Sequence, residues 1–206
     1  MIKILYITKD EKTLIEKCKQ QDLVAQKYLF DMYSKKMITV CLRYVKNEED
    51  AQDIINNAFL KVFLKIKQYK AEGKLEAWIR RIVINTTLDF IKSNKYYRKN
   101  FINVREFNLY GAPNDENDVQ DEWWDAASSL SMKQLYQMIQ ELPHATRLVF
   151  NLYALDEFSH KEIAKKLNIS IGTSKWHLFN ARKILKENIN DLLEAKNNNH
   201  DAKKYR

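Results

Sequence analysis

The stretch SHKEIAKKLNISIGTSKWHLFNARKILK, residues 159–186, predicts two short helices joined by a tight turn. Ser159 is followed three residues later by Glu162, the pairing that forms a capping box at the start of a helix. Ser170 can cap the second helix, because its side-chain oxygen can accept a hydrogen bond from a backbone N–H. This arrangement predicts a helix-turn-helix whose recognition helix spans residues 171–187.

The predicted recognition helix has two faces. An apolar stripe at helical spacing is expected to be buried, and its members are Ile171, Ser174, Leu178, Ala181 and Leu185. A helix that reads base edges with a polar front and contacts phosphates with basic flanks needs such a division. The candidate contacts to duplex DNA are Thr173, Ser174, Lys175, Trp176, His177, Asn180, Arg182 and Lys183. The alternative, on spacing alone, is an ordinary helical hairpin with a solvated basic face.

The composition favours an all-α fold in a reducing compartment. The 206 residues leave room for one or two compact domains. Three Gly and two Pro are too few for the many tight turns of an all-β fold. Cys18 and Cys41 lie far apart without a metal-ligand spacing, which suits a cytoplasmic protein. No apolar run is long enough to span a bilayer, and the apolar patch within residues 1–12 is too short for a signal peptide.

The distribution of charge is more informative than the net charge of +8. Residues 60–100 carry eleven Lys or Arg against three acids, whereas residues 111–125 carry six acids and no base. A basic block of this kind indicates a polyanionic partner, either nucleic acid or an acidic membrane.

Four helices are predicted in the first hundred residues, over 11–20, 23–45, 48–67 and 75–97. The third begins at an acidic run, where carboxylates favour the positive end of the helix dipole. Expected core residues of the first two are Leu14, Ile15, Cys18, Leu29, Met32, Tyr33, Met37, Val40, Cys41 and Tyr44. The outer face of the third carries Asp50, Asp53, Asn57 and Lys61, and chemistry alone assigns this face to solvated surface.

A basic segment follows the third predicted helix. The loop 69–74 contains the only Gly of the first hundred residues, and the next helix carries Arg80, Arg81 and Asn85. Aromatic rings beside cations suit single-stranded nucleic acid, because bases stack on the rings while cations follow the backbone. Trp78 fits such stacking and the core equally well, since aromatics at helical spacing usually belong to the core.

Residues 101–130 break the helical pattern and predict an acidic linker. Trp123 and Trp124 are unusual in a linker and are candidates for docking on a domain or a partner. The predicted division is an N-terminal helical domain over 1–100, the linker over 101–130, a helix-turn-helix domain over 131–196, and a frayed basic tail over 197–206.

Three segments together resemble a known family: CLRYVKNEEDAQDIINNAFLKVF (41–63), AWIRRIVINTTLDFIKSNK (77–95) and residues 141–186, which include the helix-turn-helix. They are similar to the extracytoplasmic-function (ECF) sigma factors of bacterial RNA polymerase. In these minimal sigma factors only regions two and four remain, joined by a variable linker. The segments LIEKCKQQD and GTSKWHL look most like members from Bacteroidetes.

The resemblance implies two further sets of functional residues. The set that docks on the polymerase is Asp50, Asp53, Asn56, Asn57 and Phe59. The set that melts the minus-ten element and captures a flipped base of the non-template strand is Tyr69, Lys70, Glu72, Lys74, Trp78, Arg80, Arg81 and Asn85. The recognition helix would read the minus-thirty-five element in the major groove. Trp176 and His177 stand where many members carry Ser and Arg, so the base preference is expected to differ.

The implied partners are core RNA polymerase, promoter DNA as duplex and as melted strand, and an anti-sigma factor of the kind with which the family often pairs. No catalytic residue, cofactor, metal or small-molecule substrate is expected. The main alternative is a conventional helix-turn-helix regulator that binds duplex DNA without polymerase. It leaves the basic, aromatic helix after the loop 69–74 unexplained. An enzyme lacks a recognisable catalytic constellation in the sequence, and a helical adaptor gains nothing from the basic block.

Overall fold

A computed structural model describes residues 10–45, 47–94, 128 and 130–204, and the regular elements within them are all helical. The predicted all-α fold class is confirmed. The chain divides into two compact units, Met1–Asn94 and Lys95–Arg206, each with its own buried core. The predicted linker, with Trp123 and Trp124, lies almost entirely outside the described residues, so its boundaries stay a prediction.

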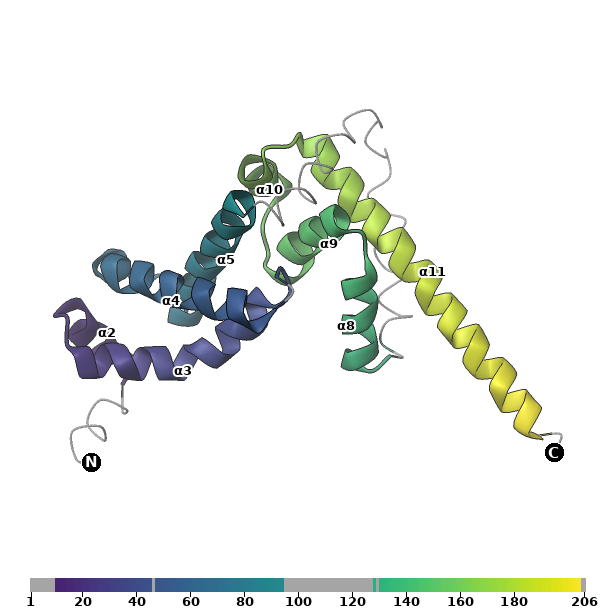
Figure 1. Cartoon of the computed structure of the whole chain (residues 1–206), viewed down its shortest axis with the longest axis horizontal. Helices are drawn as coiled ribbons and strands as arrows, with labels where there is room; N and C mark the ends of the chain where they lie inside the picture. Colours follow the sequence, from purple (N-terminus) through teal and green to yellow (C-terminus); the bar gives the residue numbers. More distant parts are fainter. Residues whose placement is uncertain (1–9, 46, 95–127, 129, 205–206) are drawn as a thin grey trace. The chain divides into compact units, whose positions relative to one another are not determined.

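The described residues of the first unit form a bundle of four α-helices and one 3-10 turn. In chain order these are α2 (Glu11–Lys19), α3 (Leu23–Cys41), α4 (Glu48–Lys65), the 3-10 turn η1 (Ile66–Gln68) and α5 (Leu75–Ser93). Helix α4 packs against both α3 and α5, while α2 packs against α3 and η1 (Figure 1). Large side chains that this packing buries completely include Leu14, Leu29, Ile55, Phe59 and Ile79.

Side-chain caps fix where the helices of the first unit begin. Asp22 caps α3 by accepting hydrogen bonds from the backbone N–H groups of Val24 and Ala25. Asn47 caps α4 in the same way, by accepting the backbone N–H of Asp50. One predicted core residue is misplaced, because Met32 is 46% exposed. The buried stripe of α3 lies on another face of the helix. The spacing of Met32 along the sequence could not show whether it belongs to the buried face or the exposed face.

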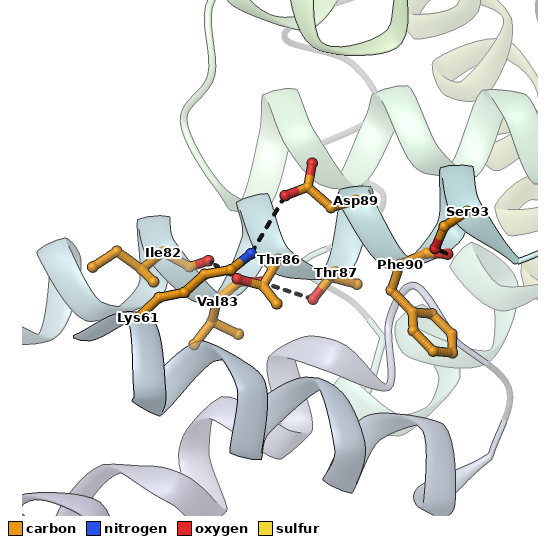
Figure 2. A network of polar contacts seen from close by, with 8 residues as sticks. All are labelled: Lys61, Ile82, Val83, Thr86, Thr87, Asp89, Phe90 and Ser93. Atoms are coloured by element: carbon orange, nitrogen blue, oxygen red, sulfur yellow. Dashed lines mark hydrogen bonds and ion pairs between the residues drawn. The ribbon is translucent and has the colours of Figure 1, made fainter. Parts of the chain in front are cut away.

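Helices α4 and α5 are joined at their surface by an ion pair and within their core by apolar packing. Lys61 on α4 reaches Asp89 on α5, with Nζ 3.5 Å from the carboxylate (Figure 2). Both partners are partly exposed, so the pair contributes little to stability. Thr86 and Thr87 are buried on α5, and each hydroxyl donates to the backbone carbonyl four residues earlier (Figure 2). Both buried threonine hydroxyls therefore have a hydrogen-bond acceptor, as buried polar groups require.

The second unit contains the predicted helix-turn-helix. Its elements are α8 (Met132–Glu141), α9 (His144–Phe150), the π-helical turn η2 (Asn151–Leu155), α10 (His160–Leu167) and α11 (Ile171–Lys204). Helix α11 packs against α8, α9 and α10, so the recognition helix rests on all three of the other α-helices described in this unit (Figure 1). None of the helices in the described part of the chain is long and apolar enough to cross a membrane.

The local signals around the turn act as predicted. Ser159 and Glu162 form a capping box, and the Ser170 hydroxyl accepts the backbone N–H of Thr173 at 2.9 Å. Asn168 ends α10 in the left-handed region, with φ of 56°, a conformation that Asn tolerates well. Helix α11 continues to Lys204 and so includes most of the predicted basic tail over 197–206, whose fraying stays a prediction. No Gly or Pro follows Gly172, so no residue in the tail breaks the helix.

Candidate nucleic-acid interface

A pocket of about 360 Å³ lies where the loop 69–74 meets the first turns of α5. It is lined by Gln68, Tyr69, Lys70, Glu72, Gly73, Lys74, Ala77, Trp78 and Arg81. Six of these belong to the set that the family resemblance assigned to the minus-ten strand. The structure therefore brings most of that set to one concave site, with apolar rings and charged side chains together in its lining.

Two aromatic rings give the pocket its rigid wall. The rings of Tyr69 and Trp78 lie 5.3 Å apart between centroids, at an interplanar angle of 48°. The Tyr69 hydroxyl donates to the backbone carbonyl of Gly73, which closes the loop across its own base. Burial raises the pKa of Tyr69, with a smaller contribution from Glu11, so the phenol keeps the proton that it donates.

Tyr69 and Trp78 differ in what they can offer a ligand. Tyr69 is only 7% exposed, so its main contribution is to hold Trp78 and the loop in place. Trp78 is partly exposed and presents ring surface to the pocket. Trp78 packs on Tyr69 and also lines the pocket, and its stacking on nucleic acid stays a prediction.

The charged members of this set are distributed around the pocket. Lys70, Glu72, Lys74 and Arg81 are exposed and line it. Arg80 and Asn85 are partly buried on α5 and lie outside the lining. Gln68 and Ala77 were not among the predicted site residues, and Gly73 was predicted only as part of the loop 69–74.

On the recognition helix, five of the eight candidate DNA contacts keep accessible surface. Lys183 is exposed, and Lys175, Trp176, Asn180 and Arg182 are partly exposed. The ring of Trp176 is held edge-on to the ring of His177, with centroids 5.0 Å apart. Trp176 is partly exposed, so part of its indole is accessible on the helix surface.

The other three candidates are buried, which corrects the expected faces of this helix. Thr173, Ser174 and His177 are 4%, 0% and 1% exposed. We withdraw them as base contacts, because a buried side chain presents no surface to a base. Ile171, assigned to the buried stripe, is 46% exposed instead. The other members of the predicted stripe, Ser174, Leu178, Ala181 and Leu185, are buried as expected. The buried face of the helix is therefore wider than predicted and also includes Thr173 and His177.

The buried polar side chains form specific bonds to other helices of the second unit. Nδ1 of His177 lies 3.1 Å from the Thr146 hydroxyl on α9. Nδ1 of His160 on α10 lies 2.9 Å from the Ser174 hydroxyl, and Tyr153 stacks on the His160 ring at 4.5 Å. These bonds hold the recognition helix from two sides. The stacking and the hydrogen bond give His160 a structural role in this unit.

The outer face of α4 carries the polar residues assigned to the polymerase. Asp53, Asn56 and Asn57 are exposed and Asp50 is partly exposed. The prediction for Phe59 is wrong, because this residue is only 1% exposed. Its ring centroid lies 4.9 Å from that of Phe30 and 6.0 Å from that of Phe63. Since its ring is inside the core, we withdraw Phe59 as a direct contact to another protein.

The thiols of the first unit show no sign of reactivity. Burial raises the pKa of Cys41 to about 11 and that of Cys18 to about 11. A thiol with a raised pKa is a poor nucleophile and a poor metal ligand, because both roles need the thiolate. No cluster of metal-ligating side chains is found among the described residues.

Two family models match the chain, one in each unit. The model described as "Sigma-70 region 2" matches residues 29–96, and the model described as "Sigma-70, region 4" matches residues 132–185. The first match contains the exposed face of α4 and the pocket. The second contains the helix-turn-helix.

Proteins named as ECF sigma factors align with this chain over nearly their whole length. The "ECF RNA polymerase sigma factor SigW" of Bacillus subtilis is 29% identical over 185 residues, which cover 88% of this chain and 97% of that protein. The "ECF RNA polymerase sigma-E factor" of Haemophilus influenzae is 24% identical over 184 residues, covering 89% and 97%. A solved structure of "CnrH in complex with the cytosolic domain of CnrY" aligns with a TM-score of 0.45 at 16% identity, covering 88% and 96%. A Bacteroidetes origin stays a prediction.

Proposed function

The chain belongs to the extracytoplasmic-function sigma factors of RNA polymerase, and from that premise we propose how its two units divide the work of promoter recognition. The protein binds core RNA polymerase in the cytoplasm and directs it to a promoter of two elements. It initiates transcription by opening and holding the DNA strands, and it does this without chemistry of its own. This family assignment favours the sigma-factor function over a conventional duplex-binding regulator.

The pocket beside α5 is the observation that carries the proposal. Its wall is an aromatic ring that has exposed surface, and its rim carries Lys70, Lys74 and Arg81. Stacking on a ring and attraction to cations are the two interactions that bind single-stranded DNA. Flipping a base out of a duplex costs a few kcal/mol, which stacking in a pocket can offset. A regulator that binds only closed duplex has no use for such a site.

The polymerase contact is proposed for the exposed face of α4. This face presents Asp50, Asp53, Asn56 and Asn57 to solvent, on a helix whose opposite side is anchored in the core by Ile54, Ile55 and Phe59. A rigid helix with an exposed polar face is suited to docking on another protein with little rearrangement. The carboxylates of the face favour a partner surface that carries positive charge.

The duplex contact is proposed for the accessible side chains of α11. Lys175, Arg182 and Lys183 are placed to contact phosphates, while Trp176 and Asn180 are placed to reach base edges. The apolar surface of an indole suits contact with a thymine methyl group. Each unit alone offers a small interface, so affinity depends on polymerase holding both units on one promoter, which raises the effective concentration of the second contact.

Strand opening provides the test. Core polymerase is combined with the full chain on a promoter that it directs, and unpaired thymines around the minus-ten element are detected by permanganate. We expect reactivity with the wild-type protein and a loss of at least about tenfold with Trp78→Ala, which removes the stacking surface. Lys12→Ala, a change on the exposed start of α2, serves as the control. Equal reactivity with Trp78→Ala would contradict the proposed role of the pocket.

A further inference from the structure

His160 lies next to the end of the recognition helix that reads DNA in a helix-turn-helix. It is the first residue of α10, and its Nδ1 lies 2.9 Å from the hydroxyl of Ser174, which is in the first turn of α11. In this motif the N-terminal residues of the recognition helix contact base edges, while the helix before it crosses the phosphate backbone. His160 therefore belongs to the helix that meets the backbone and stands beside the helix end that meets the bases.

The imidazole ring of His160 is held by two other elements of the second unit. The ring of Tyr153, from η2, stacks on it with centroids 4.5 Å apart and an interplanar angle of 23°. Ser174, from α11, is fully buried, whereas His160 is partly exposed. The ring thus extends from a buried hydroxyl to the surface in one fixed pose, and a group that is already oriented loses little freedom when it binds a ligand.

The bond to Ser174 decides which ring nitrogen carries a proton. A buried hydroxyl needs an acceptor for its hydrogen, and Nδ1 of His160 is within reach to accept it. The neutral ring then carries its own proton on Nε2, and the protonated ring carries one on each nitrogen. In both states Nε2, the ring nitrogen that does not face Ser174, is a hydrogen-bond donor.

A phosphate of the DNA backbone is the ligand that matches this donor. Phosphate oxygens only accept hydrogen bonds, and a charged acceptor makes the stronger kind of bond. Lys161, which follows on α10, is exposed, and Lys175 on α11 is partly exposed, so both neighbours add positive charge. The start of α10 is not itself the proposed site, because Ser159 and Glu162 close a capping box there.

We propose that His160 is a further DNA-binding residue, whose Nε2 donates a hydrogen bond to a backbone phosphate of the duplex that α11 reads. Ser174 and Tyr153 are positioning residues for this contact. The inference rests on the proposed function, because it assumes that α11 enters the major groove of a promoter. A phosphate contact selects no sequence by itself but fixes the register of the protein on the duplex. His160 therefore helps to set the register in which Trp176 and Asn180 meet the bases.

The test uses holoenzyme assembled from core polymerase and the full-length protein, on a promoter to which the protein directs core polymerase. Single methylphosphonate linkages, each of which removes the charge of one phosphate, are placed in turn along both strands of the minus-thirty-five element. Competition binding gives the loss of affinity at each position.

Two variants remove the proposed donor in different ways. His160→Ala deletes the ring. The double variant His160→Phe with Ser174→Ala keeps a ring beside Tyr153 and leaves no buried hydroxyl without an acceptor. Lys165→Ala, at an exposed position on the same helix, is the control. Circular dichroism compares the fold of each variant with that of the wild type.

We expect the wild type and Lys165→Ala to lose about tenfold in affinity at one phosphate, the scale of one hydrogen bond to a charged group. Both His160 variants should bind the unmodified promoter less tightly and show no further loss at that phosphate, because its partner is already gone. If they lose as much as the wild type at every position, the imidazole contacts no phosphate, and the inference fails while the proposed function stands. If the wild-type holoenzyme does not bind the promoter, the inference and the proposed function fail together.

Discussion

Nδ1 of His177 and the hydroxyl of Thr146 lie 3.1 Å apart in the interior of the second unit, and their hydrogen bond joins the recognition helix to α9. Both side chains are almost fully buried, at 1% and 2% exposure. His177 was predicted to contact a base, but its hydrogen bond instead holds α11 in place on α9. The accessible side chains of α11 are the ones left to contact DNA. We therefore expect a substitution of the buried His177 to lower stability, and a substitution of the exposed Lys183 to weaken DNA binding instead.

His177→Ala should lower the free energy of unfolding of the second unit by about 1–3 kcal/mol, because it leaves the buried Thr146 hydroxyl without its partner. Thermal or urea unfolding measures this loss. Lys183→Ala is the matched control, since Lys183 is exposed on the same helix. It should leave stability within about 0.5 kcal/mol and weaken DNA binding evenly across sequences. Normal stability in His177→Ala would show that the bond has no structural role.

Phe59 and Asp53 on α4 should separate folding from polymerase binding. Phe59→Ala removes a buried ring that packs on Phe30 and Phe63, so the first unit should lose about 3–5 kcal/mol of stability. Asp53→Ala changes an exposed side chain and should keep the stability of the wild type. Its affinity for core polymerase, measured by competition, should fall. Unchanged affinity in Asp53→Ala would remove this residue from the proposed interface.

Tyr69→Phe should weaken strand opening with a small cost in stability. The substitution keeps the ring beside Trp78 but removes the hydroxyl that donates to the Gly73 carbonyl. One lost hydrogen bond costs about 0.5–1.5 kcal/mol. We expect the loop to close less firmly, so the permanganate signal should fall by less than with Trp78→Ala. A fall as large as that of Trp78→Ala would assign the hydroxyl a direct role in binding DNA.

The first unit should lose stability as the pH rises from about 9 to 11. Burial raises the pKa of Cys18 and of Cys41 from 9.0 to about 11 in the folded state. Above pH 9 the unfolded chain releases these protons while the native state keeps them, so rising pH favours unfolding. Urea unfolding at a series of pH values measures the slope. In Cys18→Ser the slope should be smaller, and an equal slope would exclude this thiol as its source.

The sequence predicted the helices and their caps because these depend on neighbouring residues. The capping box of Ser159 and Glu162 and the cap at Ser170 are both confirmed. It failed where tertiary contacts decide the outcome. His177 and Thr173 are polar and were assigned to the DNA-binding face. Spacing alone could not show that both are buried or that Thr146 forms a hydrogen bond with His177 in the interior.

The sequence predicted which segments form the candidate site, but not the role of each side chain in it. The loop 69–74 and Trp78 were assigned to the melted strand through resemblance, and the structure places them around one pocket. That Tyr69 supports the pocket rather than presenting its surface depends on a hydrogen bond to a backbone carbonyl, which no side-chain pattern encodes. The misassignment of Phe59 has the same origin, since its burial depends on α3.

Transcription from a genomic promoter library tests the central claim most directly. Purified bacterial core polymerase is supplied with the library, with and without the full-length protein, and the starts of abortive transcripts are sequenced. We predict starts that arise only when the protein is present and that lie downstream of a shared motif of two elements at fixed spacing. The absence of such starts, together with no co-elution of the protein with core polymerase, would contradict the account. The protein would then be a conventional regulator of duplex DNA.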